Sequence, residues 1–257
     1  MTTLFDLTGK TCLVTGSTKG IGEAIVHRLA EHGANVVVSS RKADACEKVA
    51  ADINAKYGKG KKVAAAIPCN INHKEQLQQL VDQTRKTFGK IDVLICNAAL
   101  NPYYGPMSEM PDEAFDKIYG ANVRSNHWLC QMVLPEMVER KDGSIVIVSS
   151  IGGLRGSPVI GAYCISKAAD MQLARNLAVE YGPHGIRANC IAPGLIRTDF
   201  ARALWENPET LKRSTSGAAL RRIGEPDEIA GAAVFLASKA GAFTTGQTFV
   251  IDGGALA

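Results

Sequence analysis

Short apolar runs alternate with segments of helical periodicity along almost the whole chain. The runs lie at residues 11–14, 35–38, 63–67, 92–96, 144–148, 188–191 and 248–251. Runs of this kind are typical of strands buried on both faces, and the helical segments between them provide the crossovers that parallel strands need. The pattern therefore predicts an α/β fold, with a doubly wound parallel sheet flanked by helices on both faces.

Length and composition fit one domain spanning residues 1–257. The chain has 257 residues, of which 46% are hydrophobic, and its mean hydropathy is near zero. This is sufficient to bury a sizeable core. Because no Pro- or Ser-rich linker, repeat or low-complexity tract marks a boundary, we expect a single domain.

Several function classes are disfavoured. Residues 1–9 carry no basic or long apolar stretch, and no window approaches 18 uninterrupted apolar residues, so we expect neither a signal peptide nor a membrane-spanning helix. The cysteines are odd in number, scattered and without a C-x-x-C spacing, which favours reduced thiols and a cytoplasmic location.

A nucleic-acid partner and a metal are not expected either. The formal net charge of +4 is modest, and the one basic cluster, at residues 56–62, is interpreted as a solvated loop rather than a nucleic-acid surface. His127 and Cys130 share a helical face. Without a second ligand pair at zinc-like spacing, we interpret them as packing residues.

A glycine-rich turn follows the first apolar run. It reads Thr15-Gly16-x-x-x-Gly20-x-Gly22, and a helical pattern continues from it to Gly33. Glycines let the backbone approach a pyrophosphate, and the helix N-terminus offers unpaired N–H groups to it. The glycines alone are equally consistent with a plain tight turn, but strand, turn and helix together predict a dinucleotide site.

Tyr163 and Lys167 lie one helical turn apart, with Ser150 upstream. A phenol has a reference pKa of about 10, and a neighbouring ammonium favours the phenolate. The tyrosine could then exchange a proton with a carbonyl oxygen that the serine hydroxyl holds. This set predicts interconversion of a ketone and an alcohol, although the Tyr-x-x-x-Lys spacing alone is common on helix surfaces.

These motifs resemble those of the short-chain dehydrogenase/reductase family, whose glycine spacing is Gly-x-x-x-Gly-x-Gly. The resemblance covers nearly the whole chain and implies one Rossmann-type domain, with a cofactor half over about residues 1–150, a catalytic and substrate half over about 151–257, and a lid over about 198–217. The matching pieces, in the family's order, are the glycine turn, Asn97-Ala98-Ala99, Asn122, Ser150, Tyr163-x-x-x-Lys167 and Pro193-Gly194.

The resemblance implies catalytic roles. Ser150 orients the substrate oxygen, Tyr163 donates the proton, and Lys167 lowers the tyrosine pKa and contacts the nicotinamide ribose. Asn122 holds a water that links Lys167 to solvent. Ser149 is adjacent and could fill the same role as Ser150. The interval between the serine and Tyr163 in the family favours Ser150. The expected cofactor-binding residues are Gly16, Ser17, Lys19, Gly20, Ile21, Gly22, Ser40, Arg41, Asn70, Ile71, Asn97, Ala98, Tyr163, Lys167, Pro193, Gly194, Ile196 and Thr198.

The end of the second strand favours NADP(H) over NAD(H). An acidic residue here would bind a free ribose hydroxyl, whereas this chain has Ser40 and Arg41. An arginine can meet a 2′-phosphate with two parallel donors, and Lys19 adds a second positive charge. Each cation alone could be an ordinary surface charge.

Two positions depart from the family's pattern. Asn70 stands where many relatives have Asp near the adenine, and Ala99 replaces a glycine of the Asn-Asn-Ala-Gly motif. An amide can still bond to adenine, so dinucleotide binding stays expected. Neither change removes a catalytic group.

An apolar or cyclic carbonyl compound is the expected small-molecule substrate. The lid carries apolar residues between charges, and loop residues Tyr103 and Tyr104, with Val159, are expected near the site. The local resemblance is to carbonyl- and retinal-reducing members. A 3-oxoacyl-thioester reductase, an epimerase or dehydratase that uses the cofactor transiently, and a non-catalytic dinucleotide-binding sensor are the alternatives.

A homotetramer, or else a homodimer, is the expected assembly. The apolar helices around Asn122 and Tyr163 and the segment at residues 249–254 match surfaces that the family uses for tetramers. The same apolar residues could instead be buried by packing within a single chain.

Overall fold

The computed structural model describes residues 3–257 and contains one sheet of seven strands, all parallel. The strand order is β3-β2-β1-β4-β5-β6-β7. The strands are β1 (Thr11–Thr15), β2 (Asn35–Ser39), β3 (Ala64–Ala66), β4 (Val93–Cys96), β5 (Gly143–Val148), β6 (Ile186–Pro193) and β7 (Thr248–Ile251). Each of these strands coincides with one of the apolar runs, so the predicted doubly wound fold is confirmed.

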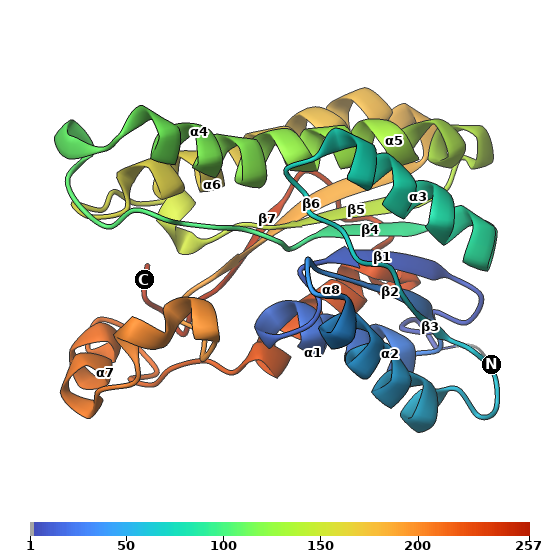
Figure 1. The fold of residues 1–257 in the computed structure, drawn as a ribbon, viewed down its shortest axis with the longest axis horizontal. Helices are drawn as coiled ribbons and strands as arrows, with labels where there is room; N and C mark the ends of the chain where they lie inside the picture. Colours follow the sequence, from blue (N-terminus) through green and yellow to red (C-terminus); the bar gives the residue numbers. More distant parts are fainter. Residues whose placement is uncertain (1–2) are drawn as a thin grey trace.

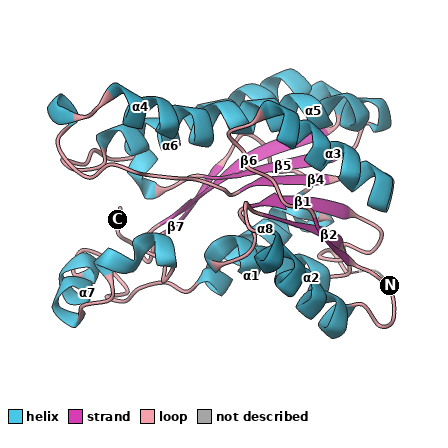
Figure 2. Ribbon diagram, viewed as in Figure 1, coloured by secondary structure: helices cyan, strands magenta, loops and turns pink. Residues whose placement is uncertain are grey.

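Helices cover both faces of the sheet (Figures 1 and 2). One face carries α1 (Gly20–Glu31), α2 (Ala43–Tyr57) and α8 (Pro226–Ala237), and the other carries α3 (Lys74–Phe88), α4 (Asp112–Tyr119), α5 (Ser125–Arg140) and α6 (Gly161–Tyr181). The central strands are buried throughout because both faces are covered. Two apolar cores result, one on each side of the sheet.

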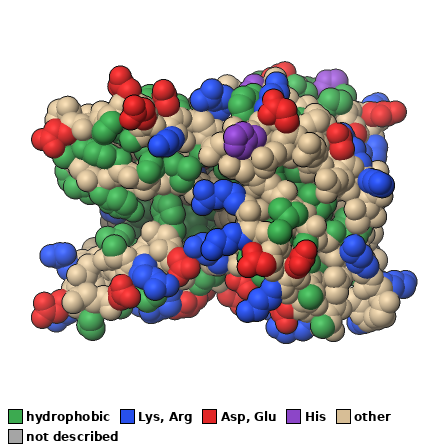
Figure 3. Space-filling view, in the orientation of Figure 1, with side chains coloured by type: hydrophobic (Ala, Val, Ile, Leu, Met, Phe, Trp, Pro, Cys, Tyr) green, Lys and Arg blue, Asp and Glu red, His purple; other side chains and the backbone are tan. Residues whose placement is uncertain are grey.

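The sheet has a topological switch point at β1. The chain builds outward from β1 to β3 and then crosses back, so that β4 lies on the other side of β1. In sheets of this kind a crevice opens beyond the carboxyl ends of the strands at the switch point. A short 3₁₀ segment (Asp199–Leu204) and α7 (Pro208–Thr215) face the start of α6 across this end of the sheet (Figure 1). Figure 3 shows a hollow with hydrophobic side chains between these two parts.

The segment between α4 and α5 differs from the continuous helical pattern in the sequence. A π-helical turn (Gly120–Arg124) joins the two helices and contains Asn122. Such turns carry an i→i+5 bond and shift the side chains that follow. The shift brings the Asn122 amide against the loop after β4, where it bonds to both backbone groups of Leu100.

Gly22 packs against the glycine turn so closely that no side chain fits. A Cβ atom at Gly22 would approach the Gly16 carbonyl oxygen, and it would lie 2.5 Å from the Asn97 Nδ2 atom. Both neighbours are fixed, because that Nδ2 atom donates to the carbonyl oxygens of Thr15 and Gly16. Gly22 therefore sets the distance between α1 and the loop after β4.

We predict that Gly22→Ala lowers the free energy of unfolding by about 1–3 kcal/mol, because the added methyl group overpacks a rigid contact. Gly231→Ala is the matched control, since Gly231 lies in α8 with open space around its Cβ position. The control should be neutral or slightly stabilising. Denaturant titration of both variants checks this, and equal stability of the two would contradict the packing argument.

Candidate active site

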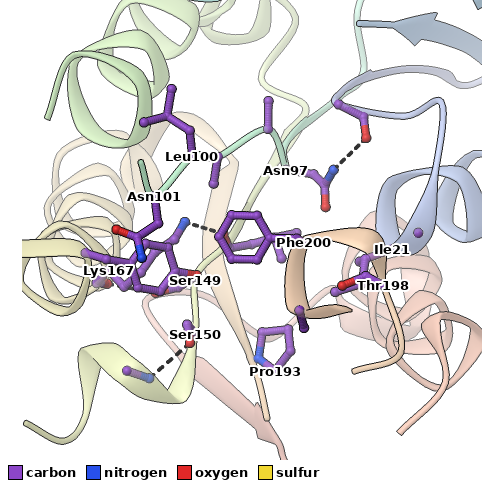
Figure 4. A pocket seen from close by; sticks show the side chains of 18 of the residues that line it. Ile21, Asn97, Leu100, Asn101, Ser149, Ser150, Lys167, Pro193, Thr198 and Phe200 are labelled. Carbon is purple, nitrogen blue, oxygen red and sulfur yellow. Dashed lines mark hydrogen bonds between the residues drawn. The ribbon is translucent and has the colours of Figure 1, made fainter. Parts of the chain in front are cut away.

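A cavity with a volume of about 710 Å³ lies at the carboxyl end of the sheet. It runs from Ser40 and Arg41 after β2, past the glycine turn, to Tyr163 on α6. The loops after β1, β2, β4, β5 and β6 all contribute to its wall, as parallel strands require. Figure 4 shows side chains from these separate elements converging on one space.

The glycine turn has the form of a cradle for a pyrophosphate. Gly16 and Gly20 have φ values of +65° and +58°, a conformation that favours glycine. No side chain caps the N-terminus of α1, so its first N–H groups are open to a ligand. Asn97 holds the turn from below through its two bonds to Thr15 and Gly16. The residues present therefore fit a dinucleotide.

All of the expected cofactor-binding residues except Ser17 line this cavity. Ser17 is buried, and its hydroxyl donates to the Val14 carbonyl oxygen and accepts from the Ser39 N–H. Its hydroxyl joins the glycine turn to β2, and cofactor binding by Ser17 stays a prediction. Thr18, Asn72 and Leu100 also line the cavity, although no motif singled them out.

The end of the cavity at β2 is positively charged. Arg41 is exposed there, and Lys19 forms an ion pair with Asp199 at 3.3 Å. Asp199 is the one carboxylate among the described residues that line the cavity, and it also pairs with Arg202. The sequence did not indicate that Lys19 meets the 3₁₀ segment through Asp199, because 180 residues separate them.

The catalytic end brings Ser150, Tyr163 and Lys167 together. Lys167 Nζ lies 5.7 Å from the centre of the Tyr163 ring. Burial raises the pKa of Tyr163, while the Lys167 charge and a hydrogen bond with Ser150 lower it, and the net shift is upward. The sequence predicted the effect of the lysine but missed the larger effect of burial. Tyr163 is therefore a neutral phenol at neutral pH, which is the form that donates a proton.

Ser150 and Ser149 have different partners. The Ser150 hydroxyl faces the cavity and accepts a bond from the Gly152 N–H at 3.0 Å (Figure 4). The Ser149 hydroxyl donates to the main-chain oxygen of Lys167 and anchors α6 to β5. Of the two, Ser150 is the one whose hydroxyl remains available to a substrate oxygen.

Asn122 lies behind the cavity wall and does not line it. Its amide nitrogen donates to Ser166 Oγ and to the Leu100 carbonyl oxygen. The atoms that meet Lys167 are instead the Val148 carbonyl oxygen and the Asp170 carboxylate. Asp170 was missed by sequence reasoning, although a charged residue within a predominantly apolar helix was a signal for it.

The substrate side of the cavity is mainly apolar. The Phe200 ring lies 5.9 Å from the Tyr163 ring and projects into the cavity (Figure 4), with Leu204 beside it on the same segment. Tyr104 and Arg155 also line the cavity. Tyr103 and Val159 were expected here and do not line this cavity. The Tyr103 hydroxyl bonds to Pro106 within its own loop, and Val159 is exposed.

Three further properties hold for the described residues. Within residues 3–257, no helix combines the length and apolarity needed to cross a membrane. The same range contains no group of three or more His, Cys, Asp or Glu side chains placed to hold a metal ion. All seven cysteines are buried free thiols.

Comparisons with known proteins agree with this geometry. Residues 16–255 match the family profile described as enoyl-(acyl carrier protein) reductase. Dehydrogenase/reductase SDR family member 4 of Bos taurus is 43% identical over 97% of this chain and 88% of its own length.

Two solved structures extend the comparison. A 7α-hydroxysteroid dehydrogenase, complexed with NADH and 7-oxo glycochenodeoxycholic acid, is 36% identical with a TM-score of 0.92, over 98% of this chain and 96% of that one. A gluconate 5-dehydrogenase of Burkholderia cenocepacia, in complex with NADP and tartrate, is 29% identical with a TM-score of 0.92, over 98% and 97%. This chain, with its glycine cradle and its Ser150, Tyr163 and Lys167 side chains at one cavity, belongs to the short-chain dehydrogenase/reductase family of oxidoreductases.

Proposed function

We propose that this protein is an NADP(H)-dependent reductase that interconverts an apolar or cyclic ketone or aldehyde and its alcohol. The observation that carries the proposal is the position of the buried Tyr163 phenol. It lies beside Ser150 and Lys167 in a cavity that is continuous with the glycine cradle. A proton donor and a dinucleotide site in one space are the parts that carbonyl reduction needs.

The chain's own residues handle the substrate oxygen and its proton. Ser150 donates a hydrogen bond to the carbonyl oxygen and holds it beside Tyr163. Tyr163 gives its proton to that oxygen as negative charge develops there, and the ammonium of Lys167 stabilises the phenolate that remains. The bound dinucleotide supplies the hydride.

The lining of the cavity supports an apolar substrate. Phe200, Leu204 and Tyr104 line the cavity, and the Phe200 ring lies beside the Tyr163 ring. A flat apolar ring fits such a lining better than a sugar, whose hydroxyls would need partners there. A 3-oxoacyl-thioester substrate remains the second candidate, because the chain matches a family profile named for an acyl-carrier-protein enzyme.

The coenzyme preference rests on charge. Related structures contain either NADH or NADP, so the fold alone does not select between them. In this chain Ser40, Arg41 and Lys19 line the end of the cavity where the adenosine ribose of a bound dinucleotide would lie. Arg41, with Lys19 beside it although paired with Asp199, favours a 2′-phosphate over a free hydroxyl.

Replacing Tyr163 by Phe is predicted to lower kcat about 10²- to 10⁴-fold, because the ring stays and only the proton donor is lost. The dissociation constant for NADPH should be nearly unchanged. Tyr104→Phe is the matched control, since it removes a hydroxyl from another tyrosine of the same cavity. Rates are measured with NADPH on a panel of cyclic ketones, diketones and 3-oxoacyl thioesters, under conditions in which chemistry limits the rate.

The raised pKa of Tyr163 adds a pH dependence with a defined sign. Below that pKa the phenol is protonated, so ketone reduction should be constant through neutral pH and fall only in alkaline solution. Alcohol oxidation needs the phenolate and should rise with pH.

A Tyr163→Phe variant that keeps more than about a tenth of the wild-type kcat would rule out Tyr163 as the donor.

Arg41→Ala is predicted to lower kcat/KM for NADPH about tenfold to a hundredfold, the worth of one charge-assisted hydrogen bond. The value for NADH should change little, because it has no 2′-phosphate. The double variant of Lys19 and Arg41 should lower the NADPH value further, and Lys42→Ala, which alters a neighbouring cation outside the cavity lining, is the control. A wild-type preference for NADH would contradict the NADP assignment, and so would a ratio of kcat/KM for NADPH to that for NADH that neither variant alters. Both results would leave the reductase proposal intact.

A further inference from the structure

A buried ion pair lies directly behind the proposed proton donor. Asp170 follows Lys167 by one turn of α6, and its Oδ2 atom lies 2.9 Å from Lys167 Nζ. The side chains are 2% and 0% exposed. Burying two charges in this way is costly unless each is paired and hydrogen-bonded. None of the proposed chemical steps uses Asp170, so its position calls for an explanation.

Burial raises the pKa of Asp170 above its ordinary value in spite of the opposing Lys167 charge, but the hydrogen bonds around the side chain are those of an ionised carboxylate. Its Oδ2 atom accepts from the Lys167 ammonium, and its Oδ1 atom accepts from Asn126 Nδ2 at 2.9 Å. The orientation of the Asn126 amide is fixed, because the same nitrogen donates to the Asn122 carbonyl oxygen. Both carboxylate oxygens therefore face donors, and neither has an acceptor for a proton of its own.

Few other charges face Lys167. On α6 its neighbours are Tyr163 and Asp170, and β5 presents the Val148 carbonyl oxygen. The nearby thiols are Cys190 on β6, and Cys96 on β4 with Cys130 on α5. Burial raises the pKa of Cys190, and a bond to Cys130 together with burial raises that of Cys96, so both thiols are neutral. Among residues 3–257, no second carboxylate pairs with Lys167.

Asp170 decides whether the lysine carries its charge. Burial on its own lowers the pKa of Lys167, yet the charge and hydrogen bond of Asp170, with help from Tyr163, reverse the shift and raise it. Without the carboxylate, the lowering effect of burial on the pKa of Lys167 would lose the largest effect that opposes it. Asp170 also acts on Tyr163, because its negative charge opposes ionisation of the phenol.

We propose that Asp170 is a positioning residue that keeps Lys167 protonated and holds its ammonium in place behind Tyr163. It does so as part of a fixed chain of groups, from Lys167 through Asp170 and Asn126 to the main chain of Asn122. The inference rests on the proposed function, because it assigns Asp170 to the control of the same proton donor. It adds a carboxylate and an amide to the residues that the sequence motifs identify.

The direct test is Asp170→Asn, which keeps the size of the side chain and removes its charge. The first measurement is the titration of Lys167 in the cofactor-free protein, followed by the carbon-13 resonance of its Cε atom. We expect the pKa of Lys167 to fall by about one to three units, the effect of an opposite charge at this distance. This measurement needs neither cofactor nor substrate.

The second measurement is the pH profile of kcat/KM for ketone reduction. Removing the negative charge lowers the pKa of both Lys167 and Tyr163. Reduction requires the protonated form of each, so the alkaline limb of the profile should move to lower pH by about one unit or more. Asp170→Glu keeps the charge and should restore the wild-type limb at least in part.

Asp92→Asn is the control for a merely structural effect. Asp92 is also buried and paired with a lysine, Lys90, but it lies at the opposite end of the sheet from the cavity. This variant should lose stability while keeping the wild-type pH profile. An equal shift of the profile in both variants, or an unchanged Lys167 titration in Asp170→Asn, would overturn the proposal.

The wild-type protein provides a further test if Asp170→Asn does not fold. A wild-type Lys167 that titrates below the ordinary lysine pKa would show that Asp170 does not offset burial, and would overturn the proposal. Titration above that value supports it. Failure of the proposed function is seen separately, as an active Tyr163→Phe variant, because the titration does not depend on turnover.

Discussion

The common direction of all seven strands is the constraint on which the site depends. Parallel strands place every carboxyl end at one edge of the sheet, and the crossover that puts β4 beside β1 opens a crevice there. The glycine turn after β1, the charged end after β2 and Ser150 after β5 therefore meet in one cavity, although they are far apart in the sequence. The helices cover both faces of the sheet, so the strands are buried and apolar. The polar groups lie in the loops at the ends of the strands.

Burial determines the chemistry of the catalytic end. Tyr163 is sheltered enough that its phenol stays protonated at neutral pH, and Lys167 is sheltered enough that its charge needs a partner. In our account Asp170 is that partner, and the polar groups behind the cavity wall form one hydrogen-bonded chain. Buried polar groups are costly when left unpaired, and here both oxygens of the Asp170 carboxylate accept from defined donors.

The sequence predicted the strands and most of the residues at the cavity, because these follow local rules: apolar runs, glycine spacing and a helical turn between Tyr163 and Lys167. It did not predict contacts between distant elements. The bond between Asn126 and Asp170 joins residues 44 positions apart on α5 and α6. Nor did the sequence predict that the Ser17 hydroxyl bonds to Ser39 on β2, 22 residues further along. Val159 was expected to point inward from its place before Tyr163, and the course of the loop turns it outward.

In the proposed reaction, Tyr163 and a bound nicotinamide act together on one carbonyl group. This can be measured by single turnover with NADPH that carries deuterium at either of the two positions on C4 of the nicotinamide, followed by mass spectrometry of the alcohol. We predict that deuterium from one of these positions, and not from the other, reaches the carbinol carbon, and that the transfer is slowed by the isotope. We also predict that Tyr163→Phe abolishes most of this transfer while NADPH remains bound. An alcohol without deuterium from either position would contradict the account.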